Sequence, residues 1–193
     1  GVIAADKSVC ACKPGFSGGG AWQGSSASYP DCTAVTCQHG TIANDKMSCT
    51  CDIGYAANGA RSGAWQTVSQ SYPVCSAVPC ANGVIAGDKS SCTCNTGYYG
   101  GGTWRAALSK YGACVAASCA NGVIANDKSA CNCAAGFSGG GSWRAGTQSY
   151  PVCLVCVAGE FQPVSGSATC VSCAAGKHRT SAGAASTEDV ACA

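Results

Sequence analysis

The sequence predicts a small disulfide-rich β protein, with tandem short β-hairpin modules in an elongated rod and little or no helix. Three observations predict it: 19 of the 193 residues are cysteine, one cysteine pattern recurs along the chain, and no window shows sustained helical periodicity. A cysteine content of about one in ten is typical of disulfide scaffolds. Disulfides at this density persist in oxidising compartments, so we expect a secreted or cell-surface protein.

Zinc binding is the competing explanation of the cysteine content. Structural zinc sites are built from histidine or from clustered Cys-x-x-Cys pairs. The only two histidines, His39 and His178, lie far apart in the sequence. Disulfides are therefore the favoured interpretation, and no metal site is assigned.

The charge balance excludes two classes of partner. Eleven basic and nine acidic residues nearly cancel, so neither nucleic acid nor an anionic membrane surface is an expected partner. Apolar runs such as residues 2–5 are far too short for a membrane span. Gly1 begins inside the repeated pattern, so we expect a processed or partial chain.

Four copies of one unit follow one another along the chain. We assign repeat 1 to residues 1–36, repeat 2 to 37–79, repeat 3 to 80–118 and repeat 4 to 119–155, followed by a C-terminal module at 156–193. Self-similarity at a fixed period is typical of chains that stack small supersecondary units. Large aliphatic residues are scarce, which also favours many small units over one large core.

Each complete repeat contains four cysteines at nearly fixed spacing. The second follows the first by 12 residues, the third follows the second by 2, and the fourth comes 20 later, or 24 in repeat 2. The longer loop of repeat 2 carries an insertion around Asn58-Gly59-Ala60-Arg61. A unit of about 40 residues needs disulfides, a metal or assembly for stability, and one disulfide contributes roughly 2–4 kcal/mol.

Two short strands are predicted near the start of each repeat. Val-Ile-Ala and Ser-Cys-x-Cys are the strand candidates, separated by Asn-Asp, Gly-Asp or Ala-Asp. These dipeptides tolerate turn conformations. Triple glycines at 18–20, 100–102 and 139–141 mark a bend or a close approach of backbone. Each repeat is therefore predicted to be a small β-hairpin module.

Three aromatic residues recur in every repeat and are the predicted core. They are one residue after a glycine (Phe16, Tyr55, Tyr98, Phe137), one tryptophan (Trp22, Trp65, Trp104, Trp143) and one tyrosine (Tyr29, Tyr72, Tyr111, Tyr150). We expect them to pack over the disulfides. The alternative is an exposed ligand platform formed by the Trp–Tyr pairs, with Arg105 and Arg144 beside two of the tryptophans.

The C-terminal module follows a different pattern. It contains two half-modules, each Cys-x-x-Gly followed by a Ser/Gly-rich stretch back to a cysteine. Only Leu154 and Val155 separate it from the last cysteine of repeat 4. So short a linker favours a stiff junction.

These patterns resemble known extracellular modules. Cys-x-Cys-x-x-Gly-Tyr/Phe resembles the C-terminal half of an EGF-like module, and Asn-Gly after the first cysteine, then Gly-Tyr, Trp and Pro-x-Cys, resemble a sushi module. Residues 156–193 resemble the cysteine-rich repeats of ephrin-receptor-like and TNF-receptor-like ectodomains. All of these families are extracellular, in agreement with the cysteine content.

The resemblance implies a pairing of first with second and third with fourth cysteine. The implied bonds are Cys12–Cys32, Cys37–Cys49, Cys51–Cys75, Cys80–Cys92, Cys94–Cys114, Cys119–Cys131, Cys133–Cys153, Cys156–Cys170 and Cys173–Cys192. A bond within Cys-x-Cys would be strained. A hairpin that turns at Asn-Asp would bring the third cysteine almost as close to the first, so a crossed pattern such as Cys37–Cys51 stays open.

Cys10 is left without a partner by this pairing, because repeat 1 contains only three cysteines. One hypothesis is that the missing cysteine precedes Gly1. The other is that a neighbouring copy supplies it in a head-to-tail polymer, although borrowing Cys192 would leave Cys173 unpaired.

Catalysis is not expected from this sequence. His39 and His178 have no repeated partner, and Glu160 and Glu188 are the only glutamates, so general-base and paired-carboxylate chemistry lack candidates. The glycine runs lack the Lys-Ser/Thr of a phosphate-binding loop. We therefore predict that the protein is not an enzyme.

No cofactor is assigned. The recurring Asp-Lys at 6–7, 45–46, 88–89 and 127–128 is interpreted as a turn with a local ion pair, because one carboxylate per repeat is too few for calcium, the alternative.

Glycosylation is predicted only in part. No Asn-x-Ser/Thr sequon exists, so N-glycans are not expected. The Ser/Thr clusters at 25–28, 165–169 and 180–187 are either O-glycan sites or bare hydrophilic loops.

Two functions are compatible with these features. The first is a structural subunit of an extracellular filament, surface hair or coat that self-associates through its repeats. The alternative is a receptor or adhesin ectodomain that binds protein or carbohydrate through exposed Trp and Tyr side chains. Near-identical repeats, short joints and low charge favour the first.

Overall fold

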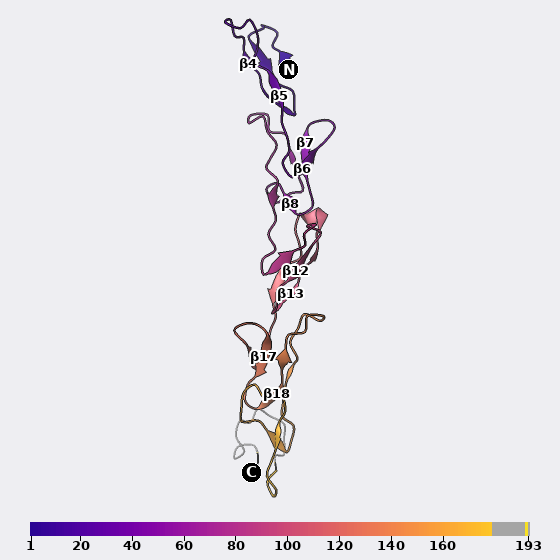
Figure 1. Ribbon diagram of the computed structural model, residues 1–193, viewed down its shortest axis with the longest axis vertical. Coiled ribbons are helices and arrows are strands. Elements are labelled where there is room, and N and C mark those ends of the chain that lie inside the picture. The colour runs from indigo at the N-terminus through magenta and orange to yellow at the C-terminus, as the bar shows by residue number, and fades with distance from the viewer. Residues whose placement is uncertain (179–191, 193) are drawn as a thin grey trace. The chain divides into compact units, whose positions relative to one another are not determined.

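The computed structural model describes residues 1–178 and Cys192. The predicted cluster at 180–187 and Glu188 lie outside these residues. The described strands are two to four residues long. The only helix among the described residues is the 3₁₀ turn η1 (Ala106–Leu108). Figure 1 shows the strands as short arrows joined by long loops. The prediction of a disulfide-rich β chain with little helix is confirmed.

Repeat 1 contains two small antiparallel sheets. The three-stranded sheet has the order β1 (Val2–Ile3), β2 (Val9–Ala11) and β4 (Gly20–Ala21). The two-stranded sheet pairs β3 (Phe16–Gly18) with β5 (Cys32–Ala34). The chain therefore alternates between the sheets, because β3 and β4 are consecutive strands that belong to different ones.

Repeat 2 has the same arrangement. Strands β6 (Gly40–Ile42), β7 (Ser48–Cys51) and β9 (Ser62–Ala64) form its three-stranded sheet. Strand β8 (Tyr55–Ala56) pairs with β10 (Ser76–Ala77).

Repeats 3 and 4 follow the same order. In repeat 3, strands β11 (Gly83–Ile85), β12 (Ser91–Cys94) and β14 (Gly102–Thr103) form the three-stranded sheet. Strand β13 (Tyr98–Gly100) pairs with β15 (Cys114–Ala116). In repeat 4, strands β16 (Gly122–Ile124), β17 (Ala130–Cys133) and β19 (Gly141–Ser142) form the three-stranded sheet. Strand β18 (Phe137–Gly139) pairs with β20 (Cys153–Val155). The C-terminal module has one described hairpin, β21 (Glu160–Phe161) with β22 (Val171–Ser172).

The Asp-Lys dipeptides form the turn between the first two strands of each repeat. The lysine is left-handed in all four copies, with φ of 58° at Lys7, 62° at Lys46, 59° at Lys89 and 59° at Lys128. In repeat 3 the carboxylate of Asp88 accepts hydrogen bonds from the Ser90 amide at 2.9 Å and from its hydroxyl at 2.8 Å. The turn is therefore held by the aspartate, as expected for an Asx-type turn.

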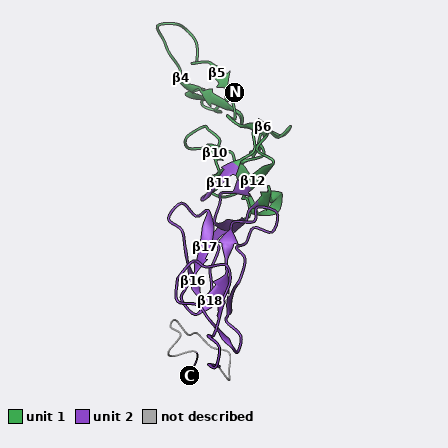
Figure 2. Cartoon of the chain, turned by 60° about the horizontal axis from the view of Figure 1, so that its bottom comes forward, with its two compact units in different colours: residues 1–80, 85–92, 102–112 green, residues 81–84, 93–101, 113–193 purple. Residues whose placement is uncertain are grey.

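The chain divides into two compact units. The first comprises residues 1–80, 85–92 and 102–112, and the second comprises 81–84, 93–101 and 113–193 (Figure 2). The division passes through repeat 3, so a compact unit does not end where a repeat ends.

Half-cystines and tyrosines form most of the core. In the first unit, Cys49, Cys51 and Cys75 are buried with Tyr72, and Trp65 packs against this cluster. The second unit has the corresponding cluster of Cys131, Cys133, Tyr150 and Cys153, and Phe161 is buried with Cys192. Sulfur atoms and aromatic rings thus take the place of aliphatic side chains in the core. They allow a repeat of about 40 residues to exclude water from its interior.

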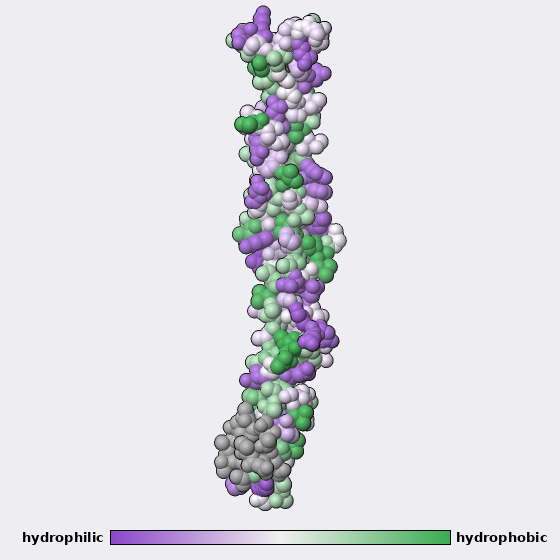
Figure 3. Space-filling model, turned by 90° about the vertical axis from the view of Figure 1, so that its left-hand side faces the viewer, coloured by the Kyte–Doolittle hydropathy of each residue, from purple (hydrophilic) through white to green (hydrophobic). Residues whose placement is uncertain are grey.

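Apolar side chains outside these clusters are scattered over the surface. Figure 3 shows green residues interspersed with purple ones on the visible face, without one continuous apolar area. No helix among the described residues is long and apolar enough to cross a membrane.

Candidate functional site

The structure pairs 18 of the cysteines in nine local disulfides. They are Cys12–Cys32, Cys37–Cys49, Cys51–Cys75, Cys80–Cys92, Cys94–Cys114, Cys119–Cys131, Cys133–Cys153, Cys156–Cys170 and Cys173–Cys192. Cys37 is thus joined to Cys49 and not to Cys51. Sequence separations of 12 to 24 residues keep each bond within one repeat or module.

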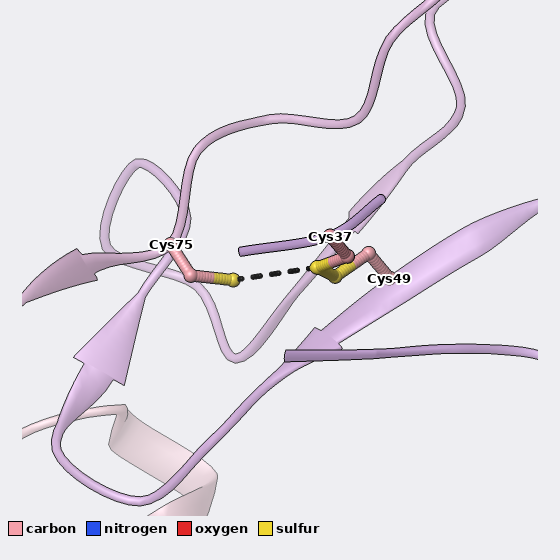
Figure 4. A group of neighbouring side chains, drawn as sticks. All are labelled: Cys37, Cys49 and Cys75. Atoms are coloured by element: carbon pink, nitrogen blue, oxygen red, sulfur yellow. Dashed lines mark hydrogen bonds between the residues drawn. A yellow bond between two sulfur atoms is a disulfide. The ribbon is translucent and has the colours of Figure 1, made fainter. Parts of the chain in front are cut away.

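The two disulfides of a repeat lie close together. Figure 4 shows Cys75 directed at the Cys37–Cys49 bond, and the Sγ atoms of Cys37 and Cys75 are 4.0 Å apart. In repeat 4 the Sγ atoms of Cys131 and Cys153 are 3.6 Å apart. Three sulfurs within reach of one ion resemble a metal site. They are oxidised here, however, and zinc binds the thiolate, so the clusters act as covalent core.

Cys10 is a free, partly buried cysteine. It occupies the position of Cys49 and Cys131 in the later repeats. Gly1 lies against it, since a Cβ on Gly1 would be 2.5 Å from the Cys10 Sγ and 3.2 Å from that of Cys32. The thiol therefore sits beside the Cys12–Cys32 bond, at the place where the later repeats have their first disulfide, such as Cys37–Cys49.

The predicted Trp–Tyr pairs are present in all four repeats. Their rings meet edge to face at centroid distances of 4.8 to 5.0 Å. Tyr72 is only 6% exposed, and its hydroxyl donates to the Lys46 carbonyl at 2.9 Å. Burial raises the pKa of Tyr72, as it does for Tyr111 and Tyr150. Tyr72, Tyr111 and Tyr150 are thus core residues that also fix the Asp-Lys turn, whereas Tyr29 is half-buried.

The tryptophans are more accessible than the tyrosines. Trp65, Trp104 and Trp143 are half-buried, whereas Trp22 is 47% exposed. Lys7, Trp22 and Tyr29 line a shallow hollow of about 260 Å³ in repeat 1. Arg105 and Arg144 are exposed. The platform interpretation therefore fits Trp22 better than the other three tryptophans.

Lysines of the turns join successive repeats. The Lys89 ammonium lies 4.5 Å from the centre of the Tyr55 ring in the preceding repeat. Lys128 lies 4.0 Å from the centre of the Tyr98 ring and also donates a hydrogen bond to its hydroxyl. In these two copies the predicted ion pair within Asp-Lys is replaced, because the ammonium binds a ring while the carboxylate accepts from serine.

Glutamine side chains clamp the joint between repeats 1 and 2 and the joint between repeats 3 and 4. The Gln70 side chain accepts from the Gly18 amide at 2.7 Å and donates to the Gly18 carbonyl at 3.3 Å. Gln148 accepts from the Gly100 amide at 2.9 Å. The equivalent residue of repeat 3 is Ser109, which is 5% exposed and faces a preceding repeat that lacks the triple glycine.

Sequence reasoning did not find these glutamines. The signal was available, because each stands two residues before a Tyr-Pro-Val-Cys motif and follows a repeat with a triple glycine. A polar residue at one loop position is nevertheless ordinary, and only the structure pairs it with a backbone 48 or 52 residues away.

The C-terminal module docks on repeat 4 through backbone hydrogen bonds. The amide of Gly136 donates to the Gln162 carbonyl at 2.7 Å, and that of Gly166 donates to the Cys133 carbonyl at 2.7 Å. Gln162 is 2% exposed, and its side chain donates to the Thr169 carbonyl. These hydrogen bonds join the module directly to repeat 4.

Comparison with known proteins gives one match. Residues 145–189 match the family described as tyrosine-protein kinase ephrin type A/B receptor-like. None of the curated proteins and none of the solved structures compared with the chain matches it. The match covers the end of repeat 4 and most of the C-terminal module, where the sequence resembled ephrin-receptor-like repeats. The EGF-like and sushi-like resemblance of the repeats stays a prediction.

These findings define the class of protein. Nine disulfides and a receptor-like cysteine-rich module are features of extracellular proteins. The chain is a disulfide-rich repeat protein, and its C-terminal part is similar to the ephrin-receptor-like cysteine-rich module.

Proposed function

We propose that this chain is the binding part of a receptor- or adhesin-type protein that recognises a cell-surface or matrix partner and has no enzymatic activity. The match of residues 145–189 to ephrin-receptor-like modules carries this proposal. In it, the repeats present binding surfaces, and the disulfides preserve them outside the cell.

The joints support this role. Lysine–tyrosine contacts and glutamine–glycine hydrogen bonds hold each repeat to its neighbour within a compact unit. A surface built across such a joint is pre-organised, and pre-organisation reduces the entropy lost on binding.

A cell-binding assay tests the proposal. Residues 1–193, secreted through an oxidising pathway and labelled, should bind cells or extracellular matrix saturably. The same chain reduced and alkylated is the control, and it should lose this binding. Equal binding by both forms, or no saturable binding to any surface, would contradict the proposal.

A filament subunit is the second candidate, and Cys10 is the observation that favours it. In repeats 2 and 4 the tryptophan and the first cysteine, Cys37 or Cys119, both pack against the buried core cluster of the repeat. Cys10 has no such cysteine to pair with, and Trp22 is half exposed. A second copy that supplied both a half-cystine and an apolar cover would extend the series.

Non-reducing electrophoresis distinguishes this second candidate. A subunit that polymerises through Cys10 should form a ladder of masses that collapses on reduction, and Cys10→Ser should abolish the ladder. A wild-type chain that stays monomeric at high concentration under mild oxidation would exclude disulfide-linked filaments.

A further inference from the structure

Tyr99 departs from the repeat pattern. The equivalent residues in the other three repeats are Ser17, Ala56 and Ser138. Successive residues of a strand point to opposite faces, and Tyr98, on the other face, contacts Lys128. Tyr99 pairs across the sheet with Val115 and remains 47% exposed. The contacts of Lys128 with Tyr98 and of Gln148 with Gly100, which join repeats 3 and 4, do not involve the Tyr99 ring. The ring is therefore available to contact a ligand.

A groove lies beside Tyr99 within the second compact unit. It has a volume of about 450 Å³, and its walls include Tyr99, Ser118, Gln148, Ser149, Pro151 and Val152. Val152 is 66% exposed, so the groove is an open surface feature and not part of the core. Its volume falls in the range of small-ligand sites, roughly 300–1,000 Å³.

The chemistry of the walls is aromatic and polar but uncharged. Among the described residues, no lysine, arginine, aspartate or glutamate lines the groove. The side-chain oxygen Oε1 of Gln148 accepts a hydrogen bond from the Gly100 backbone amide at 2.9 Å. This bond holds the Gln148 side-chain amide in place at the wall of the groove. The hydroxyls of Ser118 and Ser149 add groups that donate and accept. A charged ligand would find no counter-charge here.

We propose that this groove binds a neutral saccharide of about one or two sugar rings, with the Tyr99 ring as the stacking platform. A sugar ring has an apolar C–H face that packs on an aromatic ring, and hydroxyls at its edge that suit amide and hydroxyl partners. This inference specifies the ligand class of the binding function proposed above and rests on that function.

The chain contains a matched site that lacks the aromatic ring. At the joint between repeats 1 and 2, Gln70 binds Gly18 as Gln148 binds Gly100, and Tyr72-Pro73-Val74 corresponds to Tyr150-Pro151-Val152. Ser17 stands there in place of Tyr99. Tyr99→Ser therefore gives this joint the residue that the joint between repeats 1 and 2 has at the corresponding position, and Ser17→Tyr makes the reverse change.

Binding is tested with a panel of neutral disaccharides, namely lactose, maltose, cellobiose and N,N′-diacetylchitobiose, by saturation-transfer NMR followed by titration. Sialyllactose is the charged counterpart of lactose. We expect at least one neutral disaccharide to bind at about one site per chain, and Tyr99→Ser to weaken it about tenfold or more. Tyr99→Phe should retain most of the affinity, because it keeps the ring.

Two further measurements guard against a folding artefact. The urea midpoint of Tyr99→Ser should match that of the wild type, and Ser17→Tyr should raise the stoichiometry from about one site to about two. The gain of a site in Ser17→Tyr does not depend on how well Tyr99→Ser folds.

Several outcomes would overturn the proposal: no binding of any neutral disaccharide, binding unchanged by Tyr99→Ser, a preference for sialyllactose, or capture of an apolar peptide at this groove instead. Saturable cell binding that Tyr99→Ser leaves intact would reject the groove but keep the proposed function. Absence of saturable cell binding by the wild-type chain would reject the proposed function itself.

Discussion

A tyrosine hydroxyl bonded to a turn carbonyl recurs in every repeat. Tyr29, Tyr72, Tyr111 and Tyr150 each donate to the carbonyl of the left-handed lysine, at 2.6 to 2.9 Å. The carbonyl belongs to a residue in a sparsely populated backbone region, so the hydrogen bond supports a conformation that costs free energy. This single contact couples the aromatic pair of the repeat to its hairpin turn.

Tyr72→Phe should lower the free energy of unfolding by about 1 kcal/mol, because the Lys46 carbonyl loses its donor while the ring stays in place. Urea unfolding followed by tryptophan fluorescence measures the change. Tyr99→Phe is the matched control, since no described residue accepts a hydrogen bond from the exposed Tyr99 hydroxyl, and it should leave the midpoint unchanged. Equal shifts in both variants would contradict the assigned role.

Burial also predicts a pH dependence. The pKa values of Tyr72, Tyr111 and Tyr150 are raised in the folded chain, with desolvation as the leading cause. The native state therefore favours the protonated phenol. The associated stability is complete below the unfolded pKa of about 10 and is lost as pH rises through the higher folded pKa.

Absorbance at 295 nm checks this expectation. A part of the tyrosine signal in the native protein should titrate at higher pH than in the reduced, urea-unfolded chain. Coincident curves would show that the three phenols are as solvated as in the unfolded state.

The triple glycines act at the scale of the element. Gly140 connects β18 to β19, so it carries the chain from the two-stranded to the three-stranded sheet. Its φ is +64°, and a Cβ there would lie 2.4 Å from the Cys131 carbonyl oxygen. Both a left-handed backbone and a close approach are thus needed at one residue. The sequence predicted a bend or a close approach, and the structure has both.

Gly140→Ala should destabilise repeat 4 by about 1–3 kcal/mol through backbone strain and the carbonyl clash. Gly146→Ala is the control in the same repeat, because a Cβ there would meet nothing within 4 Å and its φ is not positive. Urea midpoints of the two variants give the comparison. A Gly140→Ala midpoint equal to that of Gly146→Ala would rule out the close approach.

The glutamine clamps predict site-specific amide exchange. Gln70→Ala should accelerate hydrogen exchange at the Gly18 amide by roughly fivefold, since one hydrogen bond is worth about 1 kcal/mol. The Gly100 amide should be unaffected, and Gln148→Ala should give the reverse pattern. NMR of the two amides reports each joint separately, and parallel changes at both would mean global loosening.

At the scale of the whole molecule, local order was predictable and the joints were not. Cysteine spacing and the absence of helical periodicity were sufficient for the β-hairpin fold, because each hairpin forms between residues close in sequence. The choice between Cys37–Cys49 and Cys37–Cys51 was left open, since the two candidate partners are two residues apart. The Lys89–Tyr55 and Gln148–Gly100 contacts cross repeat boundaries, where no local periodicity applies.

The disulfide core predicts how the chain loses its fold. Because half-cystines occupy the core of each unit, full reduction should unfold every repeat even without denaturant. Far-UV circular dichroism and the fluorescence of Trp65 and Trp143 measure this. The pair Cys51→Ala and Cys75→Ala should lower stability by roughly 2–4 kcal/mol, with the Trp143 signal unchanged. Retention of native circular dichroism after reduction would contradict a sulfur-dependent core.

The glutamine clamps also make the contacts of each repeat depend on which repeat precedes it, because each glutamine contacts a glycine of the preceding repeat. In both copies where a glutamine occupies the loop position, the preceding repeat has a triple glycine whose backbone the glutamine contacts, as Gln70 contacts Gly18. Ser109 occurs behind the one repeat with an insertion. Deleting repeats 2 and 3 would place Gln148 behind Gly18 and preserve a compatible neighbour, whereas deleting repeat 2 alone would set Ser109 there. The repeats resemble one another closely, yet they are not interchangeable.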